Sequence, residues 1–144
     1  MSLPRVRRAD RLVELRGRAV DAALGELAKA AARTLESEAL ARDAEARWES
    51  AVTVASAACG SAADVGGAHA YLQSLRQRAD GAAVAVRVAR ADEETRRLAV
   101  AAARTEHRKL ELWRDGLLTA ERAGAERLER RASDEVAARI ARRP

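Results

Sequence analysis

The chain has very few of the residues that build thick globular cores or covalent frameworks. It contains no Phe, its aromatic residues make up 2%, and Cys59 is its one cysteine. A single cysteine cannot form an internal disulfide and has no neighbouring thiol with which to bind zinc, which favours a reducing compartment. With so few bulky side chains, a core thick enough to enclose an enzyme-like pocket is not expected.

Proline and long apolar runs are also scarce. The two prolines are Pro4 and Pro144, so helix can extend over the whole interval between them. The longest stretch without charge, residues 50–63, is shorter than the about 20 apolar residues that cross a bilayer. The first ten residues carry charge but lack the apolar stretch of a secretory signal. We therefore expect a cytoplasmic protein without membrane insertion.

What is abundant is charge, at 34% of residues, together with Ala, Leu, Arg and Glu, all good helix formers. Over residues 5–58 apolar or small residues recur every seven positions, as in one row of a coiled-coil seam. This row is Val6, Val13, Val20, Leu27, Thr34, Ala41, Trp48 and Ala55. The row three residues further on is mostly Ala. Small residues there predict a partner helix that approaches closely.

Three glycines, Gly60, Gly66 and Gly67, interrupt this pattern and predict a turn over residues 59–67. A second helix is expected over residues 68–142, with a kink at residues 80–81. Its expected seven-residue row is Val84, Ala91, Leu98, Thr105, Leu112 and Thr119. Leu117 and Leu128 are eleven residues apart, which we interpret as a stutter in the repeat.

The predicted fold is all-α: a single domain, residues 1–144, formed by a long two-helix antiparallel coiled-coil hairpin. Because the second helix is longer, Arg5 should lie opposite about Arg122. The remaining C-terminal stretch would then extend past the first helix and expose apolar side chains at Leu128, Val136 and Ile140. Exposed apolar surface of this kind favours binding to a protein partner.

No motif for catalysis is present. The sequence has no phosphate-binding glycine loop and no His-Glu-x-x-His pair. His107 and Glu111 have the one-turn spacing of a helical metal pair, but no third group joins them, and we interpret them as a surface ion pair. We predict no catalytic residue, no metal site and no cofactor, and hence no enzyme.

The net charge of +5 raises the alternative of nucleic-acid binding. Arginines cluster near both termini, and an antiparallel hairpin would gather the two clusters at one end. Acidic residues are interleaved almost throughout, however, and there is no aromatic stacking surface, so we expect no nucleic acid as a partner. A further alternative is a homo-oligomeric structural coiled coil, which would bury the same seven-residue rows between chains.

Three segments resemble one family. The ending with Asp134, Glu135, Val136, Ala137 and Arg139 resembles the C-terminus of FliJ-type proteins, the small cytosolic stalk subunits of type III export machines, whose injectisome counterparts are called SctO. The segment from Tyr71 to Leu75 resembles the family's aromatic and apolar segment after the turn. The stretch from Arg104 to Trp113 resembles its charged helix with leucines and an aromatic residue.

The resemblance implies a non-enzymatic stalk, similar to the two-helix stalk of the rotary ATP synthase gamma subunit. Such a stalk couples the hexameric export ATPase to the cytosolic domain of the membrane export gate and promotes assembly of the ATPase. It would be cytoplasmic, associated with the inner-membrane export apparatus, and monomeric when free, with export chaperones as further partners.

The resemblance and the position on the helices also imply which residues make contact. The gate candidates are Trp48, Tyr71 and Leu75, which as apolar residues at helical spacing are equally suited to the hairpin's own seam. The ATPase candidates lie towards the two termini: Arg7, Arg8, Arg11, Leu128, Arg131, Asp134, Glu135 and Ile140.

Overall fold

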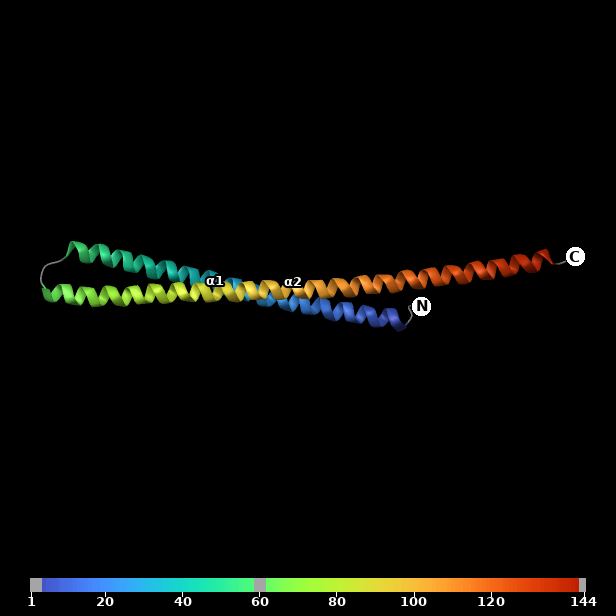
Figure 1. The fold of residues 1–144 in the computed structure, drawn as a ribbon, viewed down its shortest axis with the longest axis horizontal. Helices are drawn as coiled ribbons and strands as arrows, with labels where there is room; N and C mark the ends of the chain where they lie inside the picture. The colour runs from blue at the N-terminus through green and yellow to red at the C-terminus, as the bar shows by residue number, and fades with distance from the viewer. Residues whose placement is uncertain (1–3, 59–61, 143–144) are drawn as a thin grey trace. The chain divides into compact units, whose positions relative to one another are not determined.

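A computed structural model describes residues 4–58 and 62–142 of the chain. It contains two helices, α1 (Pro4–Ala57) and α2 (Ala62–Ala141), and no strand among the described residues (Figure 1). The two long helices pack against each other, so the expected all-α, two-helix hairpin is confirmed. Pro4 is the first residue of α1, a position that proline favours because the missing N–H has no helical partner there.

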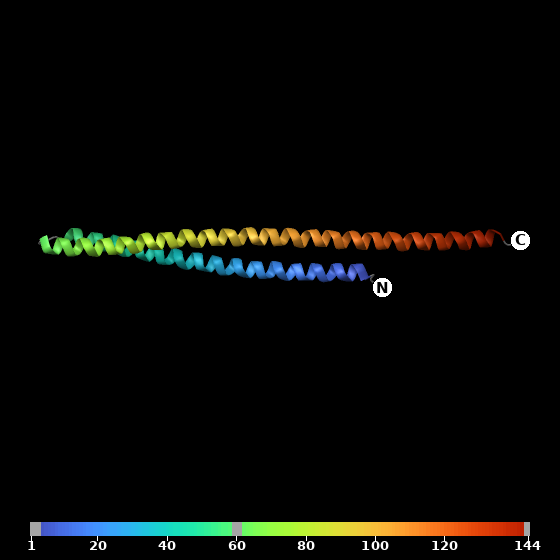
Figure 2. The same cartoon turned by 60° about the horizontal axis from the view of Figure 1, so that its bottom comes forward.

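The chain divides into two compact units. The hairpin unit is Ala22–Val100, and the termini unit combines Met1–Asp21 with Ala101–Pro144. Within each unit a segment of α1 runs antiparallel to a segment of α2, which both Figure 1 and Figure 2 show.

The seven-residue row predicted for α1 is confirmed as its inner face. Every member is buried or half-buried, from Val6 at the start of the helix to Ala55 near its end. The companion row is also turned inwards, except that Arg16 and Ala58 are exposed. The spacing was a reliable guide here because an apolar row at period seven stays on one side of a helix.

The seam between the helices is made largely of small side chains. Ala9 is 0% exposed, Ala30 1% and Ala79 4%. Thr34, also buried, keeps its hydroxyl satisfied by donating a hydrogen bond to the carbonyl oxygen of Ala30, at 3.1 Å. Small residues allow close backbone approach, but they bury little apolar area per residue.

The row predicted for α2 is wrong. Each of its six members, from Val84 to Thr119, is exposed. In the hairpin unit the inner face of α2 instead includes Leu72, Leu75, Ala79, Ala82, Val86, Ala89 and Val100. In the termini unit it includes Ala103, His107, Leu110, Arg114, Leu117, Glu121 and Gly124. Two faces of α2 carry an apolar seven-residue spacing, and the spacing alone does not say which one meets α1.

The predicted stutter is also wrong. In the termini unit Leu117, Glu121 and Gly124 are all half-buried, in steps of four and three residues. A further step of four reaches Leu128, so the eleven-residue interval continues the heptad without an insertion. Leu128 is exposed and lies beside Arg5, near the start of α1.

The observed helix bounds differ from the expected ones at the turn. Residues 59–61 lie outside the described part, whereas Gly66 and Gly67 lie within the first turns of α2, which begins at Ala62. The helix also continues without interruption through Asp80 and Gly81, where a kink was expected. Each helical glycine costs about 1 kcal/mol, and burial of the inner face that follows offsets this cost.

Ion pairs between the helices match the antiparallel register in the hairpin unit. Arg90 Nη2 lies 2.7 Å from Glu38 Oε1, and Arg76 Nη1 lies 3.2 Å from Glu45 Oε1. Glu38 thus pairs with α2 and not with Arg42, which lies four residues further along α1. Pairs this exposed are worth at most about 1 kcal/mol each, yet they distinguish one register from its neighbours in a seam of similar small residues.

Other ion pairs join residues four apart along one helix. They are Glu14 with Arg18, Asp43 with Arg47, Asp92 with Arg96, Glu93 with Arg97 and Glu126 with Arg130. Such pairs are typical of solvated helix faces.

Two helical glycines of α1 give a stability prediction. A Cβ added at Gly25 would meet no atom within 4 Å, and one at Gly17 would lie 3.6 Å from His107 Nε2, an ordinary contact. We expect Gly25→Ala and Gly17→Ala each to stabilise the protein by about 0.5–1 kcal/mol, because alanine loses less backbone entropy in a helix. Thermal unfolding followed by circular dichroism should show a higher Tm. An unchanged or lower Tm for Gly25→Ala would contradict this helix geometry.

Candidate partner-binding surfaces

The last part of α2, in the termini unit, carries an unpaired apolar stripe. Leu128 is 67% exposed, Val136 56% and Ile140 68%. With Ala132 they follow one another in steps of four residues, so they wind slowly along one side of the helix. Figure 1 shows α2 continuing past the start of α1 in this unit. We name the segment 128–140 the tail.

The tail also carries the charged candidates. Arg131, Asp134 and Glu135 are exposed and make no ion pair with a described residue. A groove of about 680 Å³ at the base of the tail is lined by Leu117, Leu128 and Arg131 of α2 and by Arg5 of α1. Arg5 thus lies alongside this part of α2, close to the position opposite Arg122 that was expected.

The basic candidates of α1 do not join the basic residues of the tail. Arg7, Arg8 and Arg11 are exposed, and they lie towards the part of α2 that precedes Arg131. Arg139 is eight residues further along α2, about 12 Å at the rise of an α-helix. Both clusters belong to the termini unit, with an offset between them along the axis of α2.

A second apolar surface lies in the hairpin unit, beside the turn. It is a groove of about 750 Å³ whose α1 side is formed mainly by small residues, with Val54, and whose α2 side contains Val65, Tyr71, Leu72 and Leu75. Tyr71 is 60% exposed, whereas Leu75 is 7% exposed. The structure thus brings these two gate candidates together, Tyr71 on the surface of the groove and Leu75 within the seam.

The third gate candidate, Trp48, does not line this groove. It is half-buried on the inner face of α1, with the Arg76 guanidinium 4.7 Å from the centroid of its ring. Arg76 in turn pairs with Glu45 and with Asp80, whose Oδ1 lies 3.0 Å from Arg76 Nε. This arrangement gives Trp48 a role in the contact between the helices.

Sequence reasoning missed the α1 side of the groove. Val54 is 67% exposed and Val65, across the turn, is 49% exposed. Val54 belongs to neither row of α1, whereas Val65 lies seven residues before Leu72, in line with the inner face of α2. The available signal was a pair of valines flanking the glycine-rich turn, close together in space because the chain reverses there.

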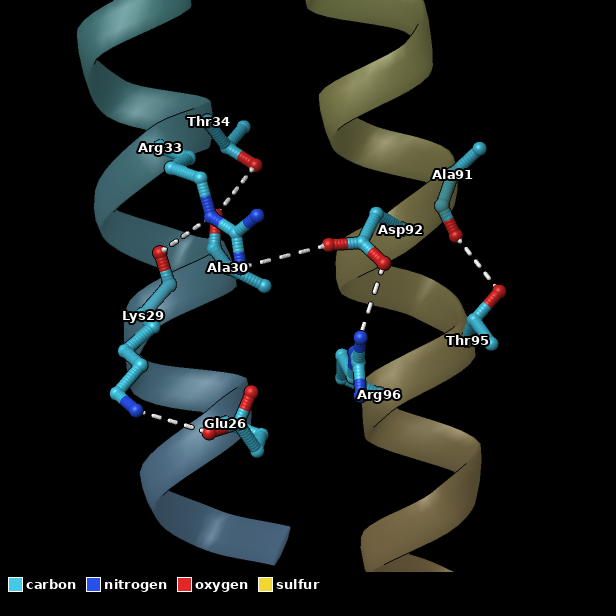
Figure 3. A network of polar contacts seen from close by, with 9 residues as sticks. All are labelled: Glu26, Lys29, Ala30, Arg33, Thr34, Ala91, Asp92, Thr95 and Arg96. Carbon is cyan, nitrogen blue, oxygen red and sulfur yellow. Dashed lines mark hydrogen bonds and ion pairs between the residues drawn. The ribbon is translucent and has the colours of Figure 1, made fainter.

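The polar network of the hairpin unit is structural (Figure 3). Lys29 Nζ donates a hydrogen bond to Glu26 Oε1 at 2.9 Å, which lowers the pKa of Glu26, and the nearby charges add to this. In the termini unit Lys109 lowers the pKa of Glu106 in the same way. A carboxyl group whose pKa is lowered by folding stabilises the folded protein at pH values above its ordinary, unfolded-state pKa. This stabilisation is lost as the pH falls through the lowered pKa of the folded state. Both groups are ionised at neutral pH and hold no proton to donate.

The suspected pair of His107 and Glu111 is not formed. His107 is half-buried against Gly17 of α1, in the termini unit, and Glu111 pairs with Arg108 at 3.1 Å. Within the described residues no group of three or more His, Cys, Asp or Glu side chains is arranged to hold a metal ion. Cys59 lies outside them. Neither helix, over its described residues, contains a stretch long and apolar enough to cross a membrane.

These features define an all-α coiled-coil protein that offers open surfaces to partners: an apolar tail in one unit and a groove beside the turn in the other. The chain belongs to the FliJ family, since the family model described as Flagellar FliJ protein matches residues 6–144. The family resemblance found in the sequence is thereby confirmed, and it makes the protein a component of the flagellar export apparatus. No curated protein and no solved structure gives a significant match.

Proposed function

We propose that this protein is a non-enzymatic stalk of the export apparatus, which couples the hexameric export ATPase to the membrane export gate and promotes assembly of the ATPase. The observation that carries the proposal is the tail. A helix end that leaves Leu128, Val136 and Ile140 exposed has apolar surface to bury against another protein. Membership of a flagellar export family supports an export component as that partner.

The ATPase contact is assigned to the termini unit. Leu128 and Ile140 supply apolar anchors, and Arg131, Asp134 and Glu135 supply charges along the same helix. Arg7, Arg8 and Arg11 on α1 add a basic patch that favours an acidic surface on the partner. Apolar anchors surrounded by charge are the usual composition of a protein interface, in which the anchors supply most of the affinity and the charges supply orientation.

The gate contact is assigned to the groove beside the turn. Tyr71 supplies an exposed aromatic ring, which combines a large apolar area with a hydroxyl for hydrogen bonding. Leu75 and Trp48 support the helices on which the groove is formed. In this proposal Tyr71 contacts the gate directly, and the other two act by holding the shape of the surface.

Reconstitution tests the proposal. The purified chain should co-purify with the cognate export ATPase and increase its rate of ATP hydrolysis or the fraction assembled as hexamer. A chain that neither binds the ATPase nor changes its activity would contradict the stalk role. Export chaperones are further candidate partners and can be tested in the same co-purification assay. Binding to the cytosolic domain of the export gate is tested separately, with this protein immobilised to capture that domain.

A further inference from the structure

The outward face of α2 in the hairpin unit carries a second, unpaired seam. Its members alternate in steps of three and four residues, are all exposed and include no charged residue. They are Gly81, Val84, Val88, Ala91, Thr95 and Leu98. All six residues are exposed, and Val88 in addition lines a shallow groove with Ala30 and Arg33 of α1. We name it the outer seam.

The side chains of the outer seam suit burial against another helix. Val88 is 64% exposed and Leu98 63%. The hydroxyl of Thr95 already donates a hydrogen bond to the carbonyl oxygen of Ala91, at 3.0 Å. Burying Thr95 therefore leaves no hydroxyl donor without an acceptor. Figure 3 shows Ala91 and Thr95 on the side of α2 turned away from α1.

Gly81, the first member of the outer seam, is compatible with burial against another helix. Glycine destabilises a helix interior, and a Cβ at Gly81 would meet no atom within 4 Å. No described residue therefore requires a glycine here, as is also true of Gly66, Gly67, Gly116 and Gly124 on α2. A glycine on an exposed heptad row does, however, leave space for a large side chain from another helix.

We propose that the outer seam binds a second copy of this chain, with the two α2 helices antiparallel. In that arrangement Leu98 of one copy faces Gly81 of the other, Val84 faces Thr95, and Val88 faces Ala91. Each layer combines a larger side chain with a smaller one. The two-fold axis that relates the two copies makes each of these layers occur twice in the dimer. A parallel arrangement would instead place Leu98 on Leu98 and leave a gap at Gly81.

The charges beside the outer seam are complementary in the same arrangement. Arg87 is exposed and makes no ion pair with a described residue. Glu94 is 55% exposed and is held by Arg97, whose Nη1 lies 2.6 Å from its Oε2. Antiparallel pairing brings Arg87 of each copy next to Glu94 of the other, so that two opposite-charge contacts flank the apolar layers.

The contact is short. From Gly81 to Leu98 the helix rises about 25 Å, and a two-helix contact of this length is smaller than a standard stable interface. The chain is then a monomer in dilute solution, as the family resemblance implies, and a dimer at high concentration. This self-association is independent of the ATPase and gate contacts, because it uses neither the tail nor the groove beside the turn.

Sedimentation velocity between about 10 µM and 1 mM tests the dimer in the weak-affinity range. The wild-type chain should shift from monomer to dimer over this interval, and Val88→Glu should remain a monomer. Leu40→Glu on α1, at a residue 61% exposed, is the matched control and should dimerise like the wild type. Equal helicity by circular dichroism shows that both variants fold. A wild-type monomer at 1 mM, or a Val88→Glu dimer, would overturn the proposal.

Cysteine crosslinking tests the register. In a Cys59→Ser background, Gly81→Cys mixed with Leu98→Cys should form a disulfide-linked heterodimer under mild oxidation. Either variant alone should crosslink poorly, because like positions lie about 25 Å apart along the antiparallel axis. An efficient Leu98→Cys homodimer would show a parallel arrangement and overturn the one proposed.

A charge exchange provides the final check. Arg87→Glu should weaken dimerisation about tenfold, since two attractive contacts become repulsive. Combining it with Glu94→Arg should restore the wild-type affinity. Failure of the double variant to recover, with helicity unchanged, would contradict the predicted pairing.

Discussion

Replacing Leu128 and Ile140 together by Asp should reduce stimulation of the cognate export ATPase at least tenfold. Both side chains are more than 60% exposed, so they contribute little to the fold, and the loss falls on the partner contact. Burying a Leu or Ile side chain against a partner is worth about 1.5–3 kcal/mol, and Asp both removes this gain and places an unpaired charge in the interface. ATP hydrolysis measured at several stalk concentrations gives the effect directly.

The control for this experiment is a pair of equally exposed leucines outside the tail. Leu35 is 66% exposed and Leu40 61% exposed, both on α1 in the hairpin unit. Leu35→Asp with Leu40→Asp should leave stimulation close to wild type, and all variants should have a similar Tm. If the tail variant stimulated the ATPase as fully as the wild type, the proposal that the tail contacts the ATPase would be contradicted.

The second large effect concerns Leu75. This side chain is 7% exposed, and Leu75→Ala removes one of the few large side chains from a seam made mostly of small residues. We expect a loss of about 2 kcal/mol in the free energy of unfolding, at the lower end of the range for buried Leu→Ala because the seam is open to solvent on both sides. Chemical denaturation followed by circular dichroism measures it.

Tyr71→Ala should behave in the opposite way. Tyr71 is 60% exposed, so its removal should change the free energy of unfolding by about 0.5 kcal/mol or less. Capture of the export gate's cytosolic domain should nevertheless fall clearly below that of the wild type. Equal capture by Tyr71→Ala and wild type would leave Tyr71 without a role at the gate.

The inner face of α1 was predictable because the chain offers one apolar row at period seven, from Val6 to Ala55. On α2 two such rows compete, and the row with Val84 and Leu98 is as apolar as the row with Leu72 and Val100. The choice depends on how side chains from both helices fit together and on pairs such as Glu38 with Arg90, which join residues 52 positions apart. A pattern read along one helix contains no information of this kind.

The candidate sites divide in the same manner. The exposed tail followed from the lengths of the two predicted helices, since the second is longer than the first and its last residues are exposed. The groove beside the turn did not, because it depends on Val54 and Val65 of different helices lining one hollow. Trp48 was assigned to the gate contact from the family resemblance and its position, whereas its ring lies against Arg76, a residue of the other helix.

The alanine-rich seam bears on how long the protein lasts in a cell. A hairpin held by few large side chains has a modest margin against unfolding, and proteases degrade chains in proportion to the time that they spend open. Any partner that binds only the folded form extends its lifetime by mass action. Cellular levels of this protein should therefore follow the supply of its partners, with surplus copies degraded.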